Sequence, residues 1–520
     1  MNKVLVGGAL VGAALAGGYF YAAHSIESNI EQMLASYNES AENEFTISYD
    51  DLDPSLLSGT ATVSGIVAQN RATPAQSIKV DTARLDVGFG FDGDADNLKS
   101  VKLNNVAASN VSETIRIGYL HVAGEGLDDL SKASSFASWS GSLHKVEVLD
   151  VEVKSSAPDS VFVLDAFVLN TSDDGNWLDE FRIKNISMTS TLPNGSPAEG
   201  KLEKFEVSGG DIGALRRFIE MTQAQAMFGV ADPAMSREMA HEMARQSLNY
   251  FGFEGFELVG LTAILPNGLG IDVESLSVRD IDRRAGMVVG AKSEISEFVV
   301  SNLGMASPAA AQMMTIAGID TFRLNGRSTI RYDEQDKRLL GQSKMTISDM
   351  FGIDSKMTFT DVDVEKMAKK LLAVQQAQFD FMEELQANPD DRLTPEEVNQ
   401  RMIQQMVEAY TGYYSGFDLA LVLADMGGTE RVFNVYSAMS GVPVPDLKVA
   451  LIGGIEQMTN TELGATTPET LMPAVKAFFA TPSQPLYLKV KSKKTPDEEA
   501  LQGLSKDNWP DLLDVSFSLR

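Results

Sequence analysis

The sequence predicts a mainly β fold with α insertions (α+β), in which repeated antiparallel hairpins follow one N-terminal transmembrane helix. Three observations predict it. Short runs that alternate apolar and polar residues, separated by Gly, Asn, Asp and Pro, succeed one another for about three hundred residues. Methionine-rich segments with helical spacing interrupt these runs. A stretch without charged residues at the N-terminus is long enough to cross a membrane.

Composition sets the first limits on function. The chain has 520 residues, 44% of them hydrophobic and 22% charged, which is typical of a folded protein that can bury a sizeable core. Its formal net charge of −29 repels phosphate backbones, so we expect no nucleic-acid partner. The absence of cysteine excludes disulfides, thiolate metal sites and cysteine nucleophiles.

The N-terminal segment predicts a membrane anchor. No charged residue occurs from Val4 to Ala23, about the length a helix needs to cross a hydrocarbon core of roughly 30 Å. Lys3 precedes this run and acidic residues follow it, which favours a cytoplasmic N-terminus with the body outside. The alternative is a signal peptide cleaved after the Ala14–Ala16 segment. We favour the anchor because helical apolar spacing continues to Tyr37.

Small residues recur at four-residue spacing within this segment. They are Gly8, Ala9, Gly12, Ala13 and Gly17. Such spacing lets two membrane helices approach closely, so a homodimer through the anchor is one interpretation. The same pattern also arises by chance in a segment rich in Gly and Ala.

Alternating runs after the anchor predict antiparallel strands with one buried and one solvated face. The clearest are 61–67, 78–87, 101–107, 115–122, 146–153, 161–168 and 183–188. An internal repeat supports this interpretation, because residues 183–195 align with residues 256–268 at an offset of 73 and both end in Leu-Pro-Asn-Gly. The repeated unit is a hairpin closed by a Pro-Asn-Gly turn.

Helical spacing predicts insertions between these strands. Each of the two main insertions follows an acidic residue, Asp211 or Asp363, that suits a helix N-terminus. Methionines that we assign as candidate apolar ligand-lining residues crowd the first insertion: Met221, Met227, Met235, Met239 and Met243. Adaptable core packing against the sheet is the simpler explanation for these methionines, and a deformable apolar surface for acyl chains or partner helices is the alternative.

These patterns divide the chain into seven segments. They are a transmembrane anchor (1–24), a juxtamembrane helix (25–40), a first antiparallel β region (41–210), a helical insertion (211–252), a second β region with the LPNG-type repeat (253–362), a helical hairpin (363–412) and a C-terminal α+β region (413–520).

No motif for catalysis or metal binding is complete. His241-Glu242 resembles half of a zinc-protease helix, but Arg245 occupies the position of the second histidine. The segment 92–97 has the spacing of a calcium loop yet lacks its Gly and its bidentate Glu, and a hairpin turn explains it better. A weak cation site at Asp50, Asp51 and Asp53 stays open.

Nucleophile and phosphate motifs fail in the same way. The segment 286–293 lacks the second Gly of a phosphate-binding loop, and Ser142 with Lys145 has no partner motif of the β-lactamase type. We therefore predict no catalytic residue, no cofactor and no metal, and expect the chain not to be an enzyme.

The anchor, its amphipathic continuation to Tyr37, and the segments 47–65 and 98–110 resemble the AsmA-like group of bacterial envelope proteins, including the YdgA-type family. The resemblance implies a single inner-membrane helix, a periplasmic body, and a long curled sheet with an apolar concave face. In larger members that face carries phospholipids. This chain is far shorter than a bridge across the envelope, so it departs from direct transport between membranes.

Three functions follow as hypotheses. The first is binding of lipid or another hydrophobic ligand in a β-groove, in support of envelope lipid homeostasis. The second is a non-enzymatic scaffold or assembly factor for envelope proteins, which predicts an exposed apolar patch. The third, an envelope hydrolase, needs paired carboxylates or a metal in a cleft.

Overall fold

The structure is a computed structural model that describes residues 35, 38–39, 44–55, 59–89, 95–127, 141–156, 159–191, 197–213, 248, 252–265, 267–305, 307–387, 412–462, 467–482, 484–493 and 509–519. The predicted anchor (1–24), nearly all of the juxtamembrane helix and most of the insertion 211–252 lie outside these residues. Two compact units form the chain, one of residues 1–216 and 256–266, the other of residues 217–255 and 267–520.

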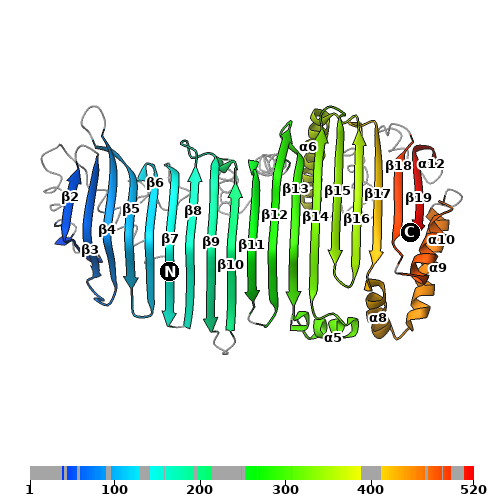
Figure 1. The fold of residues 1–520 in the computed structure, drawn as a ribbon, viewed down its shortest axis with the longest axis horizontal. Coiled ribbons are helices and arrows are strands. Elements are labelled where there is room, and N and C mark those ends of the chain that lie inside the picture. The colour runs from blue at the N-terminus through cyan, green and yellow to red at the C-terminus, as the bar shows by residue number, and fades with distance from the viewer. Residues whose placement is uncertain are drawn as a thin grey trace. The chain divides into compact units, whose positions relative to one another are not determined.

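Unit 1 is an antiparallel sheet in which consecutive strands pair in chain order (Figure 1). The exception is at its first strands, where β1 and β2 both pair with β3. The strands are β1 (Phe45–Ser48), β2 (Asp51–Ser55), β3 (Thr60–Asn70), β4 (Ser77–Phe89), β5 (Ala95–Ser109), β6 (Glu113–Glu125), β7 (Ser142–Ser156), β8 (Asp159–Thr171), β9 (Leu178–Thr191), β10 (Pro197–Ser208) and β11 (Gly255–Ile264).

One residue near the middle of each strand from β3 to β11 drops out of regular pairing, and we call this line the crease. In β3 and β4, for example, Ser64 pairs with Thr82 and Ile66 pairs with Val80, so the residues between them face each other unpaired. Alternate strands carry a residue with positive φ there, which favours Gly, Asn and Asp. The crease residues are Gly65, Asp81, Asn105, Gly118, Asp150, Asp165, Asn185, Glu203 and Gly260.

The crease shifts the alternation of side chains by one residue, so that apolar residues in both halves of a strand share one face. Each strand therefore follows the pattern apolar-x-apolar-x-x-apolar-x-apolar. In β3 the four apolar positions are Ala61, Val63, Ile66 and Ala68, all fully buried. In β9 they are Phe181, Ile183, Ile186 and Met188. The core of unit 1 lies on this face.

Unit 2 also consists of antiparallel strands, with several helices added. Its strands pair in chain order from β12 to β19. They are β12 (Gly270–Arg284), β13 (Met287–Ser301), β14 (Phe322–Asp333), β15 (Arg338–Ile347), β16 (Phe351–Thr360), β17 (Gly416–Asp425), β18 (Leu486–Ser492) and β19 (Leu513–Leu519). Its helices are η4 (Leu303–Met305), α5 (Pro308–Ala317), α6 (Val364–Ala387), α8 (Gly428–Ser440), α9 (Val444–Glu462), α10 (Leu471–Ala480) and α12 (Trp509–Leu512).

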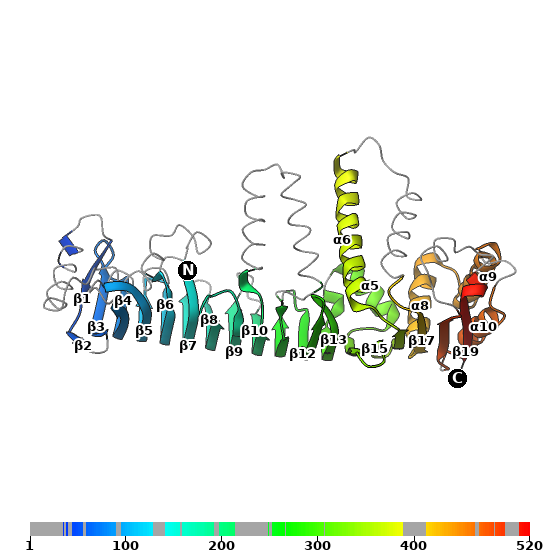
Figure 2. The same cartoon turned by 90° about the horizontal axis from the view of Figure 1, so that it is seen from above.

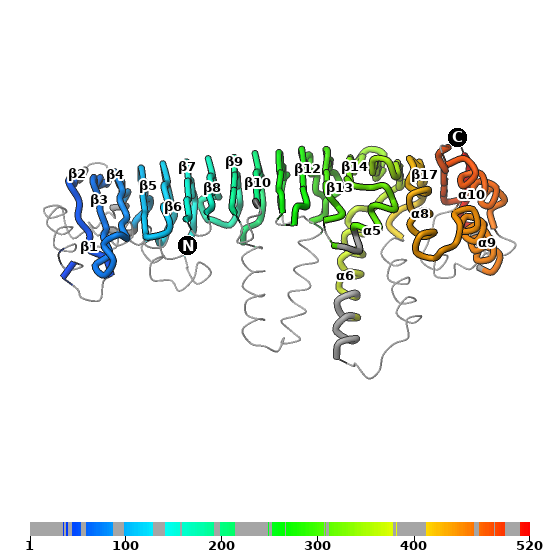
Figure 3. Tube along the Cα trace, turned by 90° about the horizontal axis from the view of Figure 1, so that it is seen from below, coloured from blue at the N-terminus to red at the C-terminus, as the bar shows by residue number. Residues whose placement is uncertain are grey.

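The helices of unit 2 are placed by short connections between strands. Helix α6 follows β16 directly and rises away from the sheet face, with only its first turns against the strands (Figure 2). Helices α8 to α10 lie together beside β17 to β19 (Figure 3). At the end of this sheet the N–H of Phe517 donates to Oγ1 of Thr470 at 2.9 Å, so one edge donor of β19 is satisfied.

The prediction of a mainly β, antiparallel chain is confirmed, and α6 begins directly after Asp363, where a helix start was expected. Helix α9 and strand β17 were missed. The repeat offset also changes, since the crease residues Asn185 and Gly260 correspond and lie 75 positions apart.

Among the described residues, no single helix has both the length and the apolar character needed to cross a membrane. Helix α8 and residues 444–461 of α9 meet the test only as a pair, which is bent by 104°.

Candidate functional site

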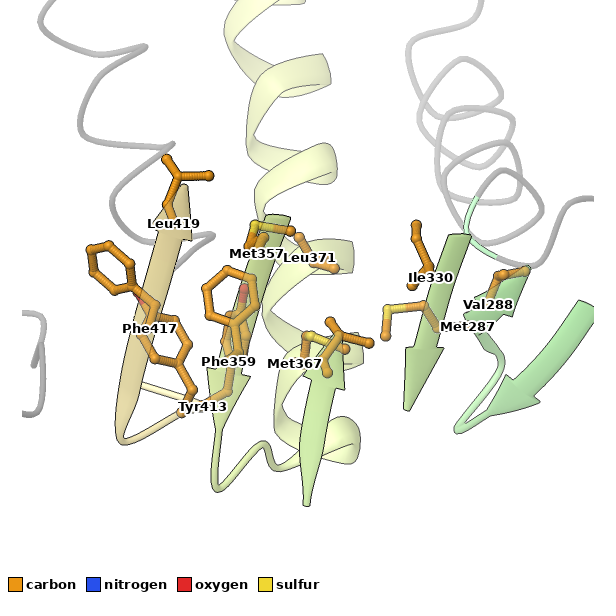
Figure 4. Close-up of a pocket in the computed structure, with 12 residues that line it drawn as sticks. Met287, Val288, Ile330, Met357, Phe359, Met367, Leu371, Tyr413, Phe417 and Leu419 are labelled. Atoms are coloured by element: carbon orange, nitrogen blue, oxygen red, sulfur yellow. The ribbon is translucent and has the colours of Figure 1, made fainter. Parts of the chain in front are cut away.

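A pocket of about 430 Å³ lies in unit 2, where the base of α6 meets the sheet (Figure 4). Its volume falls within the range of roughly 300–1,000 Å³ that is typical of small-molecule sites. Its lining residues come from five strands, one helix and the segment before β17. They are Met287, Val288, Ile330, Leu339, Met357, Phe359, Met367, Leu371, Tyr413, Tyr414, Phe417 and Leu419.

The floor of the pocket consists of two rows of side chains that run across the sheet. In the first row Ile330 pairs with Gly341, Gly341 with Met357, and Met357 with Leu419. The floor reaches solvent, because Ile330 and Met357 are 39% and 37% exposed. Gly341 carries no side chain, so the floor is lowest at β15.

The second row runs parallel to the first and carries larger rings. Leu339 pairs with Phe359, and Phe359 pairs with Phe417. Since strand side chains alternate between faces, the spacing of two between Met357 and Phe359 places both on the pocket side. The rows therefore form one continuous apolar surface.

One wall of the pocket is the first part of helix α6. Met367 and Leu371 are four residues apart and lie on one face of the helix, over the sheet (Figure 4). The helix begins at a defined point because Oδ1 of Asp363 accepts a hydrogen bond from the N–H of Lys366 at 3.0 Å. This capping bond sets which residues of α6 face the pocket.

A second wall is aromatic and comes from the segment that leads into β17. The ring centroid of Tyr414 lies 4.8 Å from that of Phe359, 5.1 Å from that of Tyr413 and 6.2 Å from that of Phe417. Such tilted and edge-to-face pairs stabilise a cluster by about 0.5–1.5 kcal/mol each beyond burial. Burial raises the pKa of Tyr414 to about 12, so its phenol stays neutral at physiological pH.

The lining residues limit the chemistry of the pocket. None of the lining residues that the structure describes is an acid, an amine, an imidazole or an amide, so they supply no carboxylate, imidazole or amine for acid–base catalysis or for an ion pair. The site suits an apolar chain held by contact rather than a polar substrate held by charge.

The predicted ligand-lining methionines, Met221 to Met243, lie outside the described residues, so the pocket does not test them. The methionines that line the pocket are Met287, Met357 and Met367, which sequence reasoning did not select. The sequence held a signal for one of them. Met357 and Phe359 alternate at the end of a strand that leads directly into the cap of a helix, which places them near the start of that helix. No sequence pattern could show that Met287, seventy residues before Met357, lines the same pocket.

Polar candidates elsewhere form no larger site among the described residues. Ser142 Oγ lies 3.1 Å from His144 Nε2, a nucleophile–base distance, but both project from one strand and no carboxylate that orients His144 is found in the described part of the chain. No group of three or more His, Asp or Glu side chains there could hold a metal ion, and this includes Asp50, Asp51 and Asp53.

Comparison with known proteins identifies no family: no family model matches the chain, and no curated protein is significantly similar to it.

Proposed function

We propose that the chain binds the acyl chain of a lipid, or a similar hydrophobic ligand, in the pocket beneath α6. The observation that carries the proposal is a pocket of about 430 Å³ whose twelve lining residues are all aliphatic, aromatic or methionine, with a floor that is partly open to solvent. Each methylene buried there contributes about 0.8 kcal/mol. Roughly ten methylenes thus offset an association cost of about 4 kcal/mol or more.

The proposal includes the place where binding occurs. The uncharged run from Val4 to Ala23, preceded by Lys3, supports a single-pass anchor in the bacterial inner membrane with the body in the periplasm. The resemblance to AsmA-like envelope proteins supports a non-enzymatic role in envelope lipid homeostasis. An acyl-binding pocket and a membrane tether together fit that role.

A photoreactive phospholipid tests the proposal. The full chain is reconstituted in nanodiscs with a lipid that carries a diazirine in its acyl chain, and cross-linked peptides are identified by mass spectrometry. We expect labelling of β16, the first part of α6 and β17 above the average for the described strands. Labelling confined to the N-terminal segment, with none in these three elements, contradicts the proposal.

A matched pair of variants makes the test specific. Gly341→Ile adds a side chain to the floor, where an added Cβ meets only Met357 at ordinary contact distances, and should abolish labelling in the pocket. Gly352→Ile adds the same side chain to the opposite face of β16, where Cβ also has ordinary contacts, and should leave labelling unchanged. Equal loss in both variants would indicate a damaged sheet rather than a filled pocket.

An exposed apolar surface on α8 and α9 favours the scaffold as the second candidate function. Tyr436 and Met439 of α8 are 63% and 72% exposed, and Val449 and Met458 of α9 are also exposed. Exposed apolar residues mark an interaction site when they gather in one patch. Because the chain has no cysteine, a Met439→Cys variant carries one cross-linker at this surface, with Val111→Cys, 82% exposed in unit 1, as the control. Envelope proteins cross-linked at position 439 but not at 111 would support the scaffold.

A further inference from the structure

The face of β14 to β16 that lies opposite the pocket carries an excess of positive charge, although the chain as a whole has a net charge of −29. Side chains alternate between the two faces of these regularly paired strands, so the odd positions of β14 and the even positions of β15 and β16 point away from Ile330 and Met357. We call this surface the back face. Figures 2 and 3 show helix α6 on the other side of the sheet, with no described helix over the back face. Its two carboxylates are Asp333 and Asp354, and its six cations are Arg323, Arg327, Arg331, Arg338, Lys344 and Lys356.

Two of these six cations are paired within the chain. A guanidinium nitrogen of Arg323 lies 2.8 Å from a carboxylate oxygen of Glu297, and one of Arg338 lies 3.7 Å from a carboxylate oxygen of Asp336. The other four are exposed and make no ion pair with any residue that the structure describes: Arg327, Arg331, Lys344 and Lys356. These four charges are therefore available to an anion from outside the chain.

The strand register brings two of these unpaired cations together. Arg327 on β14 lies directly opposite Lys344 on β15, and like charges at such a position destabilise an antiparallel pair. On the other side of Arg327 lies Glu294, but its carboxylate is 3.1 Å from a guanidinium nitrogen of Arg279. Asp354 lies opposite Lys344 on β16 and makes no ion pair with a described residue. The local excess of positive charge therefore costs stability, and an external anion would offset that cost.

The other side chains of the back face indicate the kind of anion. Protein interfaces centre on apolar or aromatic anchors, but the large apolar side chains that β14 to β16 expose, Ile330 and Met357, both lie on the pocket face. Between the unpaired cations lie Thr329 and Gln342, which are polar and uncharged. The cations project from three adjacent strands about 4.8 Å apart, so they share one surface. Such a surface suits a layer of phosphate groups held by charge alone, which is what the surface of an anionic bilayer presents.

We infer that the back face binds the phosphate groups of an anionic phospholipid bilayer through Arg327, Arg331, Lys344 and Lys356. Each Lys or Arg near such a surface strengthens binding about fivefold. Acidic residues elsewhere in the chain oppose binding little, because charges more than about 10 Å away are largely screened at about 0.1 M salt. The pocket opens on the opposite face, so this contact is one that the proposed acyl binding does not require.

Acetylation of lysines in the full chain tests the inference. The chain is held in nanodiscs of phosphatidylcholine with increasing shares of phosphatidylglycerol, and mass spectrometry measures how fast each lysine reacts. We expect phosphatidylglycerol to slow the acetylation of Lys344 and Lys356, and about 1 M salt, which shortens the Debye length to about 3 Å, to reverse the effect. Lys184 and Lys201, exposed on β9 and β10, are the controls and should react at the same rate in every nanodisc.

Three results of this experiment would overturn the inference. One is unchanged acetylation of Lys344 and Lys356 when phosphatidylglycerol is added. Another is equal slowing at the control lysines, which would show that anionic lipid acts on the whole chain. The third is equal slowing by inorganic phosphate in pure phosphatidylcholine, because the back face would then bind a free anion rather than a bilayer.

Two double variants make the test specific. Arg327→Gln with Arg331→Gln removes two charges, so the affinity for phosphatidylglycerol, measured at Lys344 and Lys356, should fall about thirtyfold. Arg327→Lys with Arg331→Lys keeps both charges and should keep most of that affinity. The glutamine variant loses the repulsion between Arg327 and Lys344, so it should keep or exceed the urea midpoint of the wild type. An undiminished affinity in the glutamine variant overturns the inference. Photolabelling of the pocket should be equal in all three proteins, which separates this result from the test of acyl binding.

Discussion

Asn185 donates a hydrogen bond from Nδ2 to Oδ2 of Asp165 at 2.7 Å, across the crease between β8 and β9. Asn105 makes the same bond to Asp81 at 2.9 Å between β4 and β5. Both asparagines have positive φ, which asparagine tolerates better than most residues do. The crease thus combines a left-handed backbone with a polar side-chain bond.

Asn185→Val should therefore destabilise unit 1. A β-branched side chain at φ 50° costs about 1–2 kcal/mol, and the lost bond to Asp165 costs about 1 kcal/mol more. Asn185→Gly loses the bond but relieves the backbone, so its cost should be smaller. Urea unfolding followed by circular dichroism measures both. Equal midpoints for the two variants would show that positive φ does not limit the residue type at this position.

Two glycines of unit 1 should respond in opposite ways to alanine. A Cβ at Gly124 would lie 2.1 Å from the backbone oxygen of Ser142, so β6 and β7 must separate to accept it. We expect Gly124→Ala to lower the free energy of unfolding by about 2 kcal/mol or more. Gly200→Ala meets nothing within 4 Å and should be neutral or slightly stabilising. The urea midpoints of the two variants should move apart; a shared midpoint would contradict this.

Helix α8 and helix α9 offer a second glycine comparison. A Cβ at Gly428 would lie 2.4 Å from the ring of Phe351 and 2.7 Å from the backbone oxygen of Met350, so Gly428→Ala should displace the start of α8. Gly453→Ala, in an open part of α9, should stabilise that helix by about 0.5–1 kcal/mol because alanine favours helix. Hydrogen exchange of the α8 and α9 peptides distinguishes the two effects. Slower hydrogen exchange in α8 of the Gly428→Ala variant than in the wild type would contradict the predicted displacement of this helix.

His121 should make stability depend on pH. Burial lowers the pKa of His121, and Lys102 and Lys145 lower it further, while Glu147 opposes the shift. The unfolded chain then binds a proton more readily than the folded chain, so stability is complete above about pH 6.5 and falls as the pH drops through the folded pKa.

A variant isolates that contribution. His121→Gln cannot titrate, so its urea midpoint should change less between pH 7 and pH 5 than that of the wild type. This window lies above the ordinary range of Asp and Glu, whose contributions appear at lower pH. A wild-type slope that persists unchanged in His121→Gln would assign the pH dependence to other groups.

Local pattern alone determined most secondary structure in the described residues. Alternation of apolar residues predicted β3 to β9, and an acidic cap before a helical period predicted α6. Helix α9 was missed because Gly453 and Gly454 interrupt its pattern, and β17 was missed because nearly every residue from Gly416 to Ala424 is apolar, so no period-two signal appears.

The crease was present in the sequence but hidden from a search for strict alternation. One residue with positive φ shifts the phase of each strand, so Val63 and Ile66 share a face although their spacing of three says otherwise. The sequence by itself also determined the absence of cysteine chemistry and the strong negative charge, because these depend on composition only.

Only the tertiary structure decided where a ligand could bind. The pocket joins Met287 to Leu419 through strand register, and its low floor at Gly341 depends on which residues of β14 and β16 stand beside it. Burial of Tyr414 depends on Phe359, more than fifty positions away. Sequence patterns indicate the secondary structure of the segment in which they occur. A pocket depends on distances between segments that are far apart in the sequence, and no local periodicity encodes those distances.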